Sequence, residues 1–338
     1  SVSDVVNVFP KKSADIDKRV KLAMQMVEND LDTILQIKAE ERTFENTPLA
    51  LDKLEGRFSV AANGIEILEM VSPDDEVRNA CHDAAIKLRQ FAVDAFMNRD
   101  IYKAFKEYVD GENLKKEVFD FEEKYFLEKS MRDFKRQGFD LPEKDFEEVK
   151  TIQKEISKLG LEFDKNVNTD KSFIVVEEKD LKGLEKDFIE NLKKDDAGKY
   201  ILTCDYPIYF EVMKHCSVAD TRKNLNLVFN NRAYPQNMDL LNSIIKKRDE
   251  LAKKLGFDSF SHLNLDSQMV KTPERANKFL SDLIEKSMRK ADQEFAEFIK
   301  ELPEGVELDE NGKMNPWDFV YVKENYKKKH FQIDEREI

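Results

Sequence analysis

The first half of this chain is dominated by apolar residues spaced three and four positions apart, the pattern of amphipathic α-helices. The first run lies between Ser13 and Lys38 and contains Ile16, Val20, Leu22, Ala23, Met26, Val27, Leu31, Ile34 and Leu35. This spacing is that of an amphipathic helix. The pattern recurs from Pro48 to Met70, from Pro73 through Leu88, twice within residues 100–137 around a weak break at Asp110-Gly111, and from Glu143 to Asn166. Six such helices in succession predict a helical bundle.

The periodicity changes after Ser172. Short β-branched runs at Phe173–Val176 and Tyr200–Thr203, within the segments 172–176 and 199–204, predict one small pair of β-strands. Helices are then expected from Ile208, at Met238–Leu255, at Ser259–Ser267 and at Pro273–Leu302, followed by a polar loop from Glu304 to Pro316. The predicted fold class is therefore mainly α with one small strand pair.

Composition supports long solvated helices and excludes several partners. Charged residues make up 37% of the 338 residues, and only ten glycines occur. The formal net charge of −13 disfavours nucleic acid, whose phosphates attract basic surfaces. No run of 18 uncharged apolar residues occurs, so we expect no membrane span.

The cysteines and the first residues bear on localisation. Cys81, Cys204 and Cys216 are odd in number and lack Cys-x-x-Cys spacing, which favours a reducing compartment over a disulfide framework. The start, Ser1-Val-Ser-Asp, lacks the basic and apolar regions of a signal peptide. We therefore expect a cytoplasmic protein.

Residues that could carry chemistry do not form a recognisable catalytic or metal-binding pattern. The four histidines are His82, His215, His262 and His330, and no two lie four positions apart, as zinc ligands on one helical face would. The neighbours His215-Cys216 diverge by about 100° on a helix and cannot easily share a metal ion. We therefore assign no catalytic and no metal-binding residue.

Three weaker patterns have ordinary structural interpretations. Glu307-x-Asp309-x-Asn311-Gly312 partly resembles a calcium loop, but Pro316 falls inside it and we interpret it as a polar turn. The carboxylate pairs Glu40-Glu41, Glu122-Glu123 and Asp195-Asp196 are expected to be solvated in a chain with 69 acidic residues. Cys204 is expected to be a core residue rather than a nucleophile.

Aromatic residues gather in two places. Tyr206, Tyr209 and Phe210 form one run, and Phe257 and Phe260 form a pair. We expect both groups to pack between helices, in preference to a peptide-binding role.

Several ordered motifs resemble the thimet oligopeptidase and neurolysin family of zinc endopeptidases. They are Tyr206-Pro, Val212-Met-Lys, Ala219-Asp-Thr-Arg, Arg248-Asp-Glu-Leu-Ala-Lys-Lys-Leu-Gly-Phe, Arg42-Thr-Phe-Glu-Asn-Thr, Leu127-Glu-Lys-Ser and Asn315-Pro-Trp-Asp. Single motifs are short, but their common order covers nearly the whole chain. In that family the His-Glu-x-x-His zinc helix lies beyond the residue at which this sequence stops.

The resemblance implies a fold of two helical lobes that face each other across a channel. By this comparison residues 1–136 would form a bundle in the first lobe and residues 137–314 the second lobe. Residues 315–338 would return to the first lobe. The chain would then be the N-terminal part of a channel-forming protein.

The resemblance also implies a function. The longer parent would be a zinc-dependent endopeptidase that hydrolyses short peptides, and this segment would contribute channel wall and size filter. Zinc would be held by the parent's C-terminal catalytic part, and this chain alone would be inactive. Two alternatives remain, a non-catalytic helical interaction module that keeps the lobe without the zinc site, and a helical bundle unrelated to peptidases.

Overall fold

The structure is a computed structural model that describes residues 9–10 and 12–332. It contains two compact units. The first, here the bundle unit, comprises residues 1–168 and 238–273, and the second, here the hairpin unit, comprises residues 169–237 and 274–338. The predicted absence of a signal peptide concerns Ser1 to Asp4, which lie outside the described residues.

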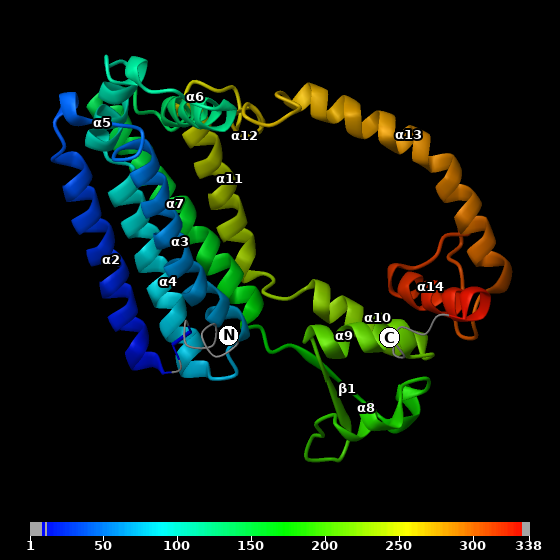
Figure 1. Ribbon diagram of the computed structural model, residues 1–338. Helices are drawn as coiled ribbons and strands as arrows, with labels where there is room; N and C mark the ends of the chain where they lie inside the picture. Colours follow the sequence, from blue (N-terminus) through cyan, green and yellow to red (C-terminus); the bar gives the residue numbers. More distant parts are fainter. Residues whose placement is uncertain (1–8, 11, 333–338) are drawn as a thin grey trace. The chain divides into compact units, whose positions relative to one another are not determined.

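Long amphipathic helices build the bundle unit (Figure 1). They are α2 (Ser13–Leu35), α3 (Pro48–Val71), α4 (Asp75–Phe96), α5 (Arg99–Val109), α6 (Phe121–Arg136) and α7 (Glu143–Asn168), with short 3₁₀ turns at Ala39–Glu41 and Leu114–Lys116. Of the nine apolar residues predicted in this pattern, six are buried, Met26 and Leu35 are partly buried against the same core, and Leu22 is exposed. Helix α4 lies against α2, α3 and α7. The predicted bundle of six successive helices is confirmed.

Capping residues explain where several of these helices begin. Pro48 occupies the first turn of α3, where its missing N–H costs nothing. The next helix starts two residues later than predicted, because the Asp74 side chain accepts hydrogen bonds from the backbone N–H groups of Glu76 and Val77. A capping box formed by Asp120 and Glu123 opens α6.

A second core in the bundle unit joins α7 to α11 (Gln236–Lys254) and α12 (Phe260–Leu265). Phe146, Val149 and Ala252 are almost fully buried there. Phe257 and Phe260 pack half-buried against this core, as the sequence predicted. Residues between 251 and 263 thus pack with α7, which ends more than 80 positions earlier in the chain.

The hairpin unit begins with the predicted strands, β1 (Phe173–Val176) and β2 (Tyr200–Thr203). They pair antiparallel, with Phe173 opposite Thr203 and Val176 opposite Tyr200. Leu202 and Tyr200 point into the core of the unit, whereas Phe173 and Val175 are exposed on the other side. Between the strands lie a 3₁₀ turn at Glu178–Leu181 and the short helix α8 (Lys186–Glu190).

Four helices complete the hairpin unit. They are α9 (Tyr206–His215), α10 (Ala219–Asn230), α13 (Pro273–Phe298), which continues into a 3₁₀ turn at Ile299–Glu301, and α14 (Pro316–Phe331). The last helix packs on α9 and α10. No helix within the described ranges is long and apolar enough to cross a membrane. The mainly α fold class with one two-stranded sheet is confirmed.

The compact units divide the chain at positions other than the expected lobe boundaries. The bundle unit continues past residue 136 to residue 168 and also takes in 238–273. The described part of 315–338 belongs to the hairpin unit, in which Asp318 is buried and paired with Arg222 of α10. The lobe boundaries of the longer parent stay a prediction from the family resemblance.

Candidate functional site

Each histidine is held by a local contact rather than directed to a shared site. Buried His82 lies with its Nδ1 2.8 Å from Glu69 Oε1. His215 is 3.8 Å from Glu211 one helical turn earlier, and His330 stacks on Tyr326 with ring centroids 4.2 Å apart. His262 lies 2.9 Å from the hydroxyl of Ser259, the N-cap of α12. Across residues 9–10 and 12–332, no group of three or more His, Cys, Asp or Glu side chains could hold a metal ion.

The three thiols lack the exposure and the lowered pKa that a nucleophilic cysteine needs. All three cysteines are free and buried. Burial raises the pKa of Cys81 to about 11, and burial also raises the pKa of Cys204 and Cys216. Because the thiolate is the nucleophilic form, none of these residues has the lowered pKa of a catalytic cysteine. The interpretation of Cys204 as a core residue is confirmed.

Several carboxylates of the acidic motifs accept hydrogen bonds from the backbone in turns or at a helix start. The Asp309 carboxylate accepts hydrogen bonds of 2.8 Å from the backbone N–H groups of Asn311 and Lys313, which closes a turn at Gly312 with φ +71°. The calcium-like pattern is therefore a polar turn. In the carboxylate pairs, Glu40, Glu41, Glu122 and Asp196 are exposed, whereas Glu123 caps α6 and Asp195 accepts from the backbone N–H of Ala197 and Lys199.

The most distinctive polar centre is a buried ion pair between two of the family-like motifs. Arg222, from the Thr-Arg motif at the start of α10, is 0% exposed, and Asp318, from the Trp-Asp motif in α14, is 2% exposed. Their Nη2 and Oδ1 atoms are 2.5 Å apart. Arg222 Nη1 also donates to the carbonyl of Cys216 at the end of α9, 2.6 Å away. One guanidinium thereby ties three helices together.

Aromatic and polar neighbours surround this centre. The guanidinium carbon of Arg222 lies 4.2 Å from the ring centroid of Tyr321. Next to Asp318, the ring of Trp317 has the Lys223 amine 5.3 Å from its centroid. Thr221 donates to the carbonyl of Asp180, 2.8 Å away, which joins α10 to the turn after β1. The sequence singled out both motifs but did not predict that their charged residues pair.

An aromatic surface lies at the Tyr-Pro motif, at the start of α9. Tyr209 is buried and stacks on Phe229 with centroids 3.7 Å apart. Tyr206 and Phe210 stack on each other at 5.7 Å but are 60% and 44% exposed. The expectation that this run packs between helices thus holds for Tyr209 and is wrong for Tyr206 and Phe210. The guanidinium carbon of Arg232 lies 3.9 Å from the Phe229 centroid and 5.7 Å from that of Tyr206.

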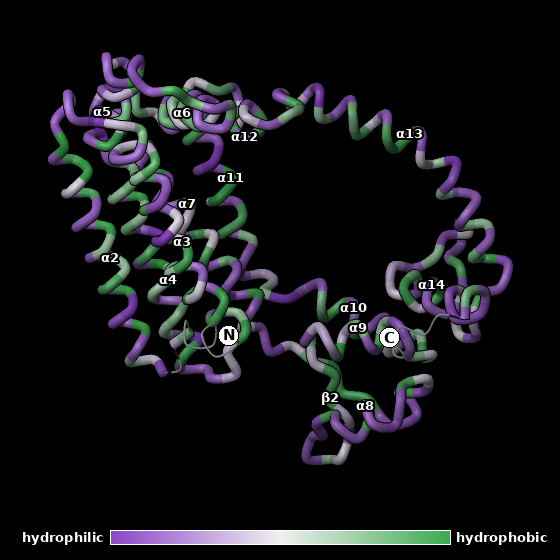
Figure 2. The backbone as a smooth tube through the Cα atoms, in the orientation of Figure 1, coloured by the Kyte–Doolittle hydropathy of each residue, from purple (hydrophilic) through white to green (hydrophobic). Residues whose placement is uncertain are grey.

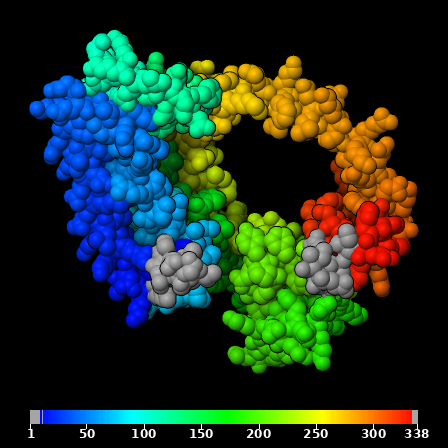
Figure 3. All heavy atoms as spheres, viewed as in Figure 1, coloured from blue at the N-terminus to red at the C-terminus, as the bar shows by residue number. Residues whose placement is uncertain are grey.

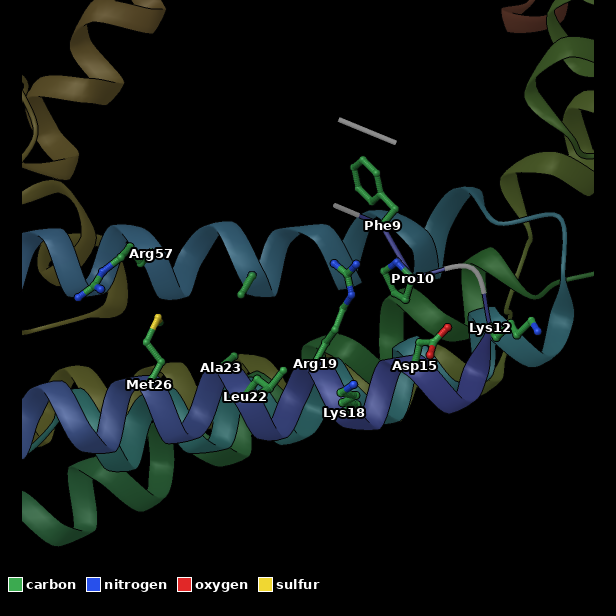
Figure 4. Close-up of a pocket in the computed structure, with 11 residues that line it drawn as sticks. Phe9, Pro10, Lys12, Asp15, Lys18, Arg19, Leu22, Ala23, Met26 and Arg57 are labelled. Carbon is green, nitrogen blue, oxygen red and sulfur yellow. The ribbon is translucent and has the colours of Figure 1, made fainter. Parts of the chain in front are cut away.

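The bundle unit has a groove between α2 and α3, near Phe9 and Pro10 (Figure 4). Its charged lining residues are Lys12, Asp15, Lys18, Arg19 and Arg57. Four cations and one carboxylate, with no histidine or cysteine among the lining residues, do not form an acid–base or metal-binding set. We assign this groove no reaction.

A second groove in the bundle unit lies beside α6, α11 and α12. Its lining includes basic residues of α6 and the apolar residues Leu251, Leu255 and Phe257 at and just after the end of α11. Arg136 donates to the Leu263 carbonyl at 2.7 Å and lies 3.1 Å from Asp266, so that it holds α6 to α12. The role of Arg136 is therefore to hold these two helices in position.

Comparison with known proteins agrees with the motif order. The model of peptidase family M3 matches residues 212–338. A thimet-like oligopeptidase from Dictyostelium discoideum is 28% identical over 320 residues, which cover 93% of this chain and 47% of that protein. Saccharolysin from Saccharomyces cerevisiae is 30% identical over 314 residues, with 89% of this chain and 43% of the relative covered.

A bacterial relative aligns in the same way. Oligopeptidase A from Escherichia coli is 24% identical over 311 residues, with 88% of this chain and 45% of the relative covered. The chain therefore spans less than half the length of these curated relatives. The match to the family model includes both Arg222 and Asp318, the two charges of the buried centre. Motif order, alignment along about nine-tenths of the chain and the match of residues 212–338 to the family model make this chain similar to peptidase family M3.

Proposed function

We propose that this chain is the N-terminal part of a zinc-dependent endopeptidase that hydrolyses short peptides. The observation that carries the proposal is the alignment of 93% of the chain with a thimet-like oligopeptidase of which it spans 47%. The chemistry would then be completed by the part of the parent that this sequence does not include. Zinc bound there would polarise the peptide carbonyl and activate water.

This segment would restrict which peptides reach the zinc site and would not itself break the peptide bond. Its helices are tied by buried contacts such as Arg222–Asp318, so they would form a firm wall beside the peptide and limit access to short, unstructured chains. The exposed Tyr206 and Phe210 rings are suited to contact peptide side chains, because aromatic faces bury a large area with little loss of conformational freedom. The three unpaired cysteines agree with a cytoplasmic location.

The natural protein tests the proposal. We expect its intact mass to be near twice the 39.6 kDa of this chain, with bound zinc and cleavage of short quenched peptides. The 338-residue chain assayed in parallel is expected to bind no zinc tightly and to cleave nothing. A natural protein near 39.6 kDa without zinc or activity would instead support the non-catalytic interaction module. One tightly held zinc per 338-residue chain would contradict the prediction that zinc is bound by the part of the parent that this sequence does not include.

A further inference from the structure

The chain passes between the bundle unit and the hairpin unit three times, after residues 168, 237 and 273. The first crossing directly follows α7, and the second lies in the first turn of α11. Movement of one compact unit relative to another is the ordinary expectation where a few connecting segments join them. The backbone at these crossings therefore decides how freely the two units can move.

Helices α7 and α11 are antiparallel neighbours within the bundle unit. Glu155 Oε2 lies 2.7 Å from Lys247 Nζ. Glu148, about two helical turns earlier in α7, pairs with Lys254, about two turns later in α11. Figure 3 shows the green atoms of α7 and the yellow-green atoms of α11 next to each other. The end of α7 therefore lies beside the start of α11, and the first two crossings leave the bundle unit at one place.

One carboxylate of the hairpin unit ties these two crossings together. Asp170 lies two residues after the end of α7, in a segment that Figure 2 shows as a hydrophilic part of the tube. Its Oδ1 accepts a hydrogen bond of 2.8 Å from the backbone N–H of Ser172, which closes a local turn. Its Oδ2 accepts one of 2.8 Å from the backbone N–H of Ala233, 63 positions later and just before α11. The second bond joins the first crossing to the second.

Ala233 is fixed in a backbone conformation that alanine rarely adopts. Its φ is +57°, and the residue is 4% exposed. A left-handed conformation is unfavourable for a residue with a Cβ and persists where the surroundings hold it. The Ala233 carbonyl accepts a hydrogen bond of 2.9 Å from the N–H of Asn237. On the other side, Arg232 Nε donates to the carbonyl of Phe229 at 3.0 Å, near the end of α10. The segment that receives the Asp170 bond is therefore anchored on both sides.

We propose that Asp170 joins the first two crossings into one paired connection, which limits the movement of the bundle unit relative to the hairpin unit. Without the bond to Ala233, each crossing would turn independently about its own backbone torsions, as hinge residues at the ends of helices do. Asp170 is in this sense a positioning residue. The proposal is independent of the peptidase function, because it concerns only the described residues around the crossings.

The variant Asp170→Asn separates the local turn from the link between the crossings. Asparagine has one side-chain oxygen, which can keep the bond from the Ser172 N–H. Its amide nitrogen would then face the Ala233 N–H and cannot accept a hydrogen bond. The local turn should therefore survive, whereas the link should be lost.

Pulsed electron paramagnetic resonance on the full-length natural protein measures the effect. Spin labels on unnatural amino acids would replace Val118 of the bundle unit, which is 98% exposed, and the exposed Glu190 of the hairpin unit. We expect the distribution of label distances to be at least about 1.5-fold wider in Asp170→Asn than in the unaltered protein, because two independent segments allow more relative movement than one paired connection. An unchanged width would overturn the proposal.

Asp195→Ala is the matched control. Asp195 also closes a turn of the hairpin unit by accepting from the backbone N–H groups of Ala197 and Lys199, but both donors lie within four positions of it. Its removal should leave the distance distribution unchanged. If both variants widened the distribution equally, the effect would be a general loosening of the hairpin unit and the proposal would fail. The fluorescence of Trp317 should be the same in Asp170→Asn and the unaltered protein, and a widened distribution with altered fluorescence would also count against the link.

Hydrogen exchange in the unaltered protein tests the link without any substitution. The Ala233 amide should exchange at least about a hundredfold more slowly than the same amide in the unfolded chain, because the Asp170 bond must open before exchange occurs. In Asp170→Asn this protection should be lost, whereas that of the Ser172 amide should remain. An Ala233 amide that exchanges in the unaltered protein as fast as in the unfolded chain would overturn the proposal, since the link would then not persist in solution.

Discussion

Replacing Asp318 by alanine is expected to destabilise the hairpin unit strongly, because it leaves the Arg222 guanidinium buried without its counter-charge. Arg222 is 0% exposed and its Nη2 lies 2.5 Å from Asp318 Oδ1, so water cannot replace the carboxylate without opening the core. Removing one partner of a buried pair costs about 3–5 kcal/mol. Cation–π contact with Tyr321 and the bond to the Cys216 carbonyl would remain and recover only part of this.

Trp317 provides the assay for this prediction. It is the only tryptophan in the chain, and it precedes Asp318 in α14. Its fluorescence during urea unfolding therefore reports on the hairpin unit. With a slope of about 2 kcal/mol per molar urea, the expected loss lowers the midpoint by roughly 1.5–2.5 M.

Two further variants separate the charge from the packing. The double variant Arg222→Met/Asp318→Leu removes both charges and should be more stable than Asp318→Ala alone, since no ion is left buried unpaired. The control Glu190→Ala removes an exposed partner of Lys186 and should change stability by less than about 1 kcal/mol. If Asp318→Ala lost less than 1 kcal/mol, or if the double variant were the least stable, the reasoning would be refuted.

Two other predictions follow from buried and hydrogen-bonded groups. The thiols of Cys81, Cys204 and Cys216 should not react with a thiol reagent in the folded chain at pH 7, because all three are buried. In denaturant all three should react, and the absorbance of the reagent counts the labelled thiols. Fast labelling of one thiol in the folded chain would contradict its burial. Burial alone would raise the pKa of Asp170, but hydrogen bonds from Ser172 and from the Ala233 N–H outweigh it and lower that pKa. The resulting stabilisation is present above the unfolded pKa of about 3.9 and is lost as pH falls through the lower folded value. The difference in urea midpoint between the native chain and Asp170→Asn should accordingly shrink from pH 7 to pH 3, and a constant difference would be inconsistent with this origin.

Local patterns in the sequence determined most of the secondary structure. The three- and four-residue spacing predicted α2, α3 and α7 to within a few residues, and the β-branched runs predicted both strands. These predictions succeed because helix and strand formation depend on residues close together in the chain. Motif order also pointed to the family, since it needs no knowledge of which residues touch.

Tertiary packing alone decided the features on which the candidate sites depend. Arg222 and Asp318 are 96 residues apart, and no local pattern indicates that their charges meet in a core. The same limit explains Tyr206 and Phe210, whose aromatic spacing suggested burial although their rings are exposed. The long helix near the end of the chain is the reverse case, since local spacing predicted it at Pro273–Leu302 and the structure has α13 at Pro273–Phe298 followed by a 3₁₀ turn at Ile299–Glu301. A periodic pattern specifies which side of a helix is apolar, but its partner is specified by the packing of distant segments.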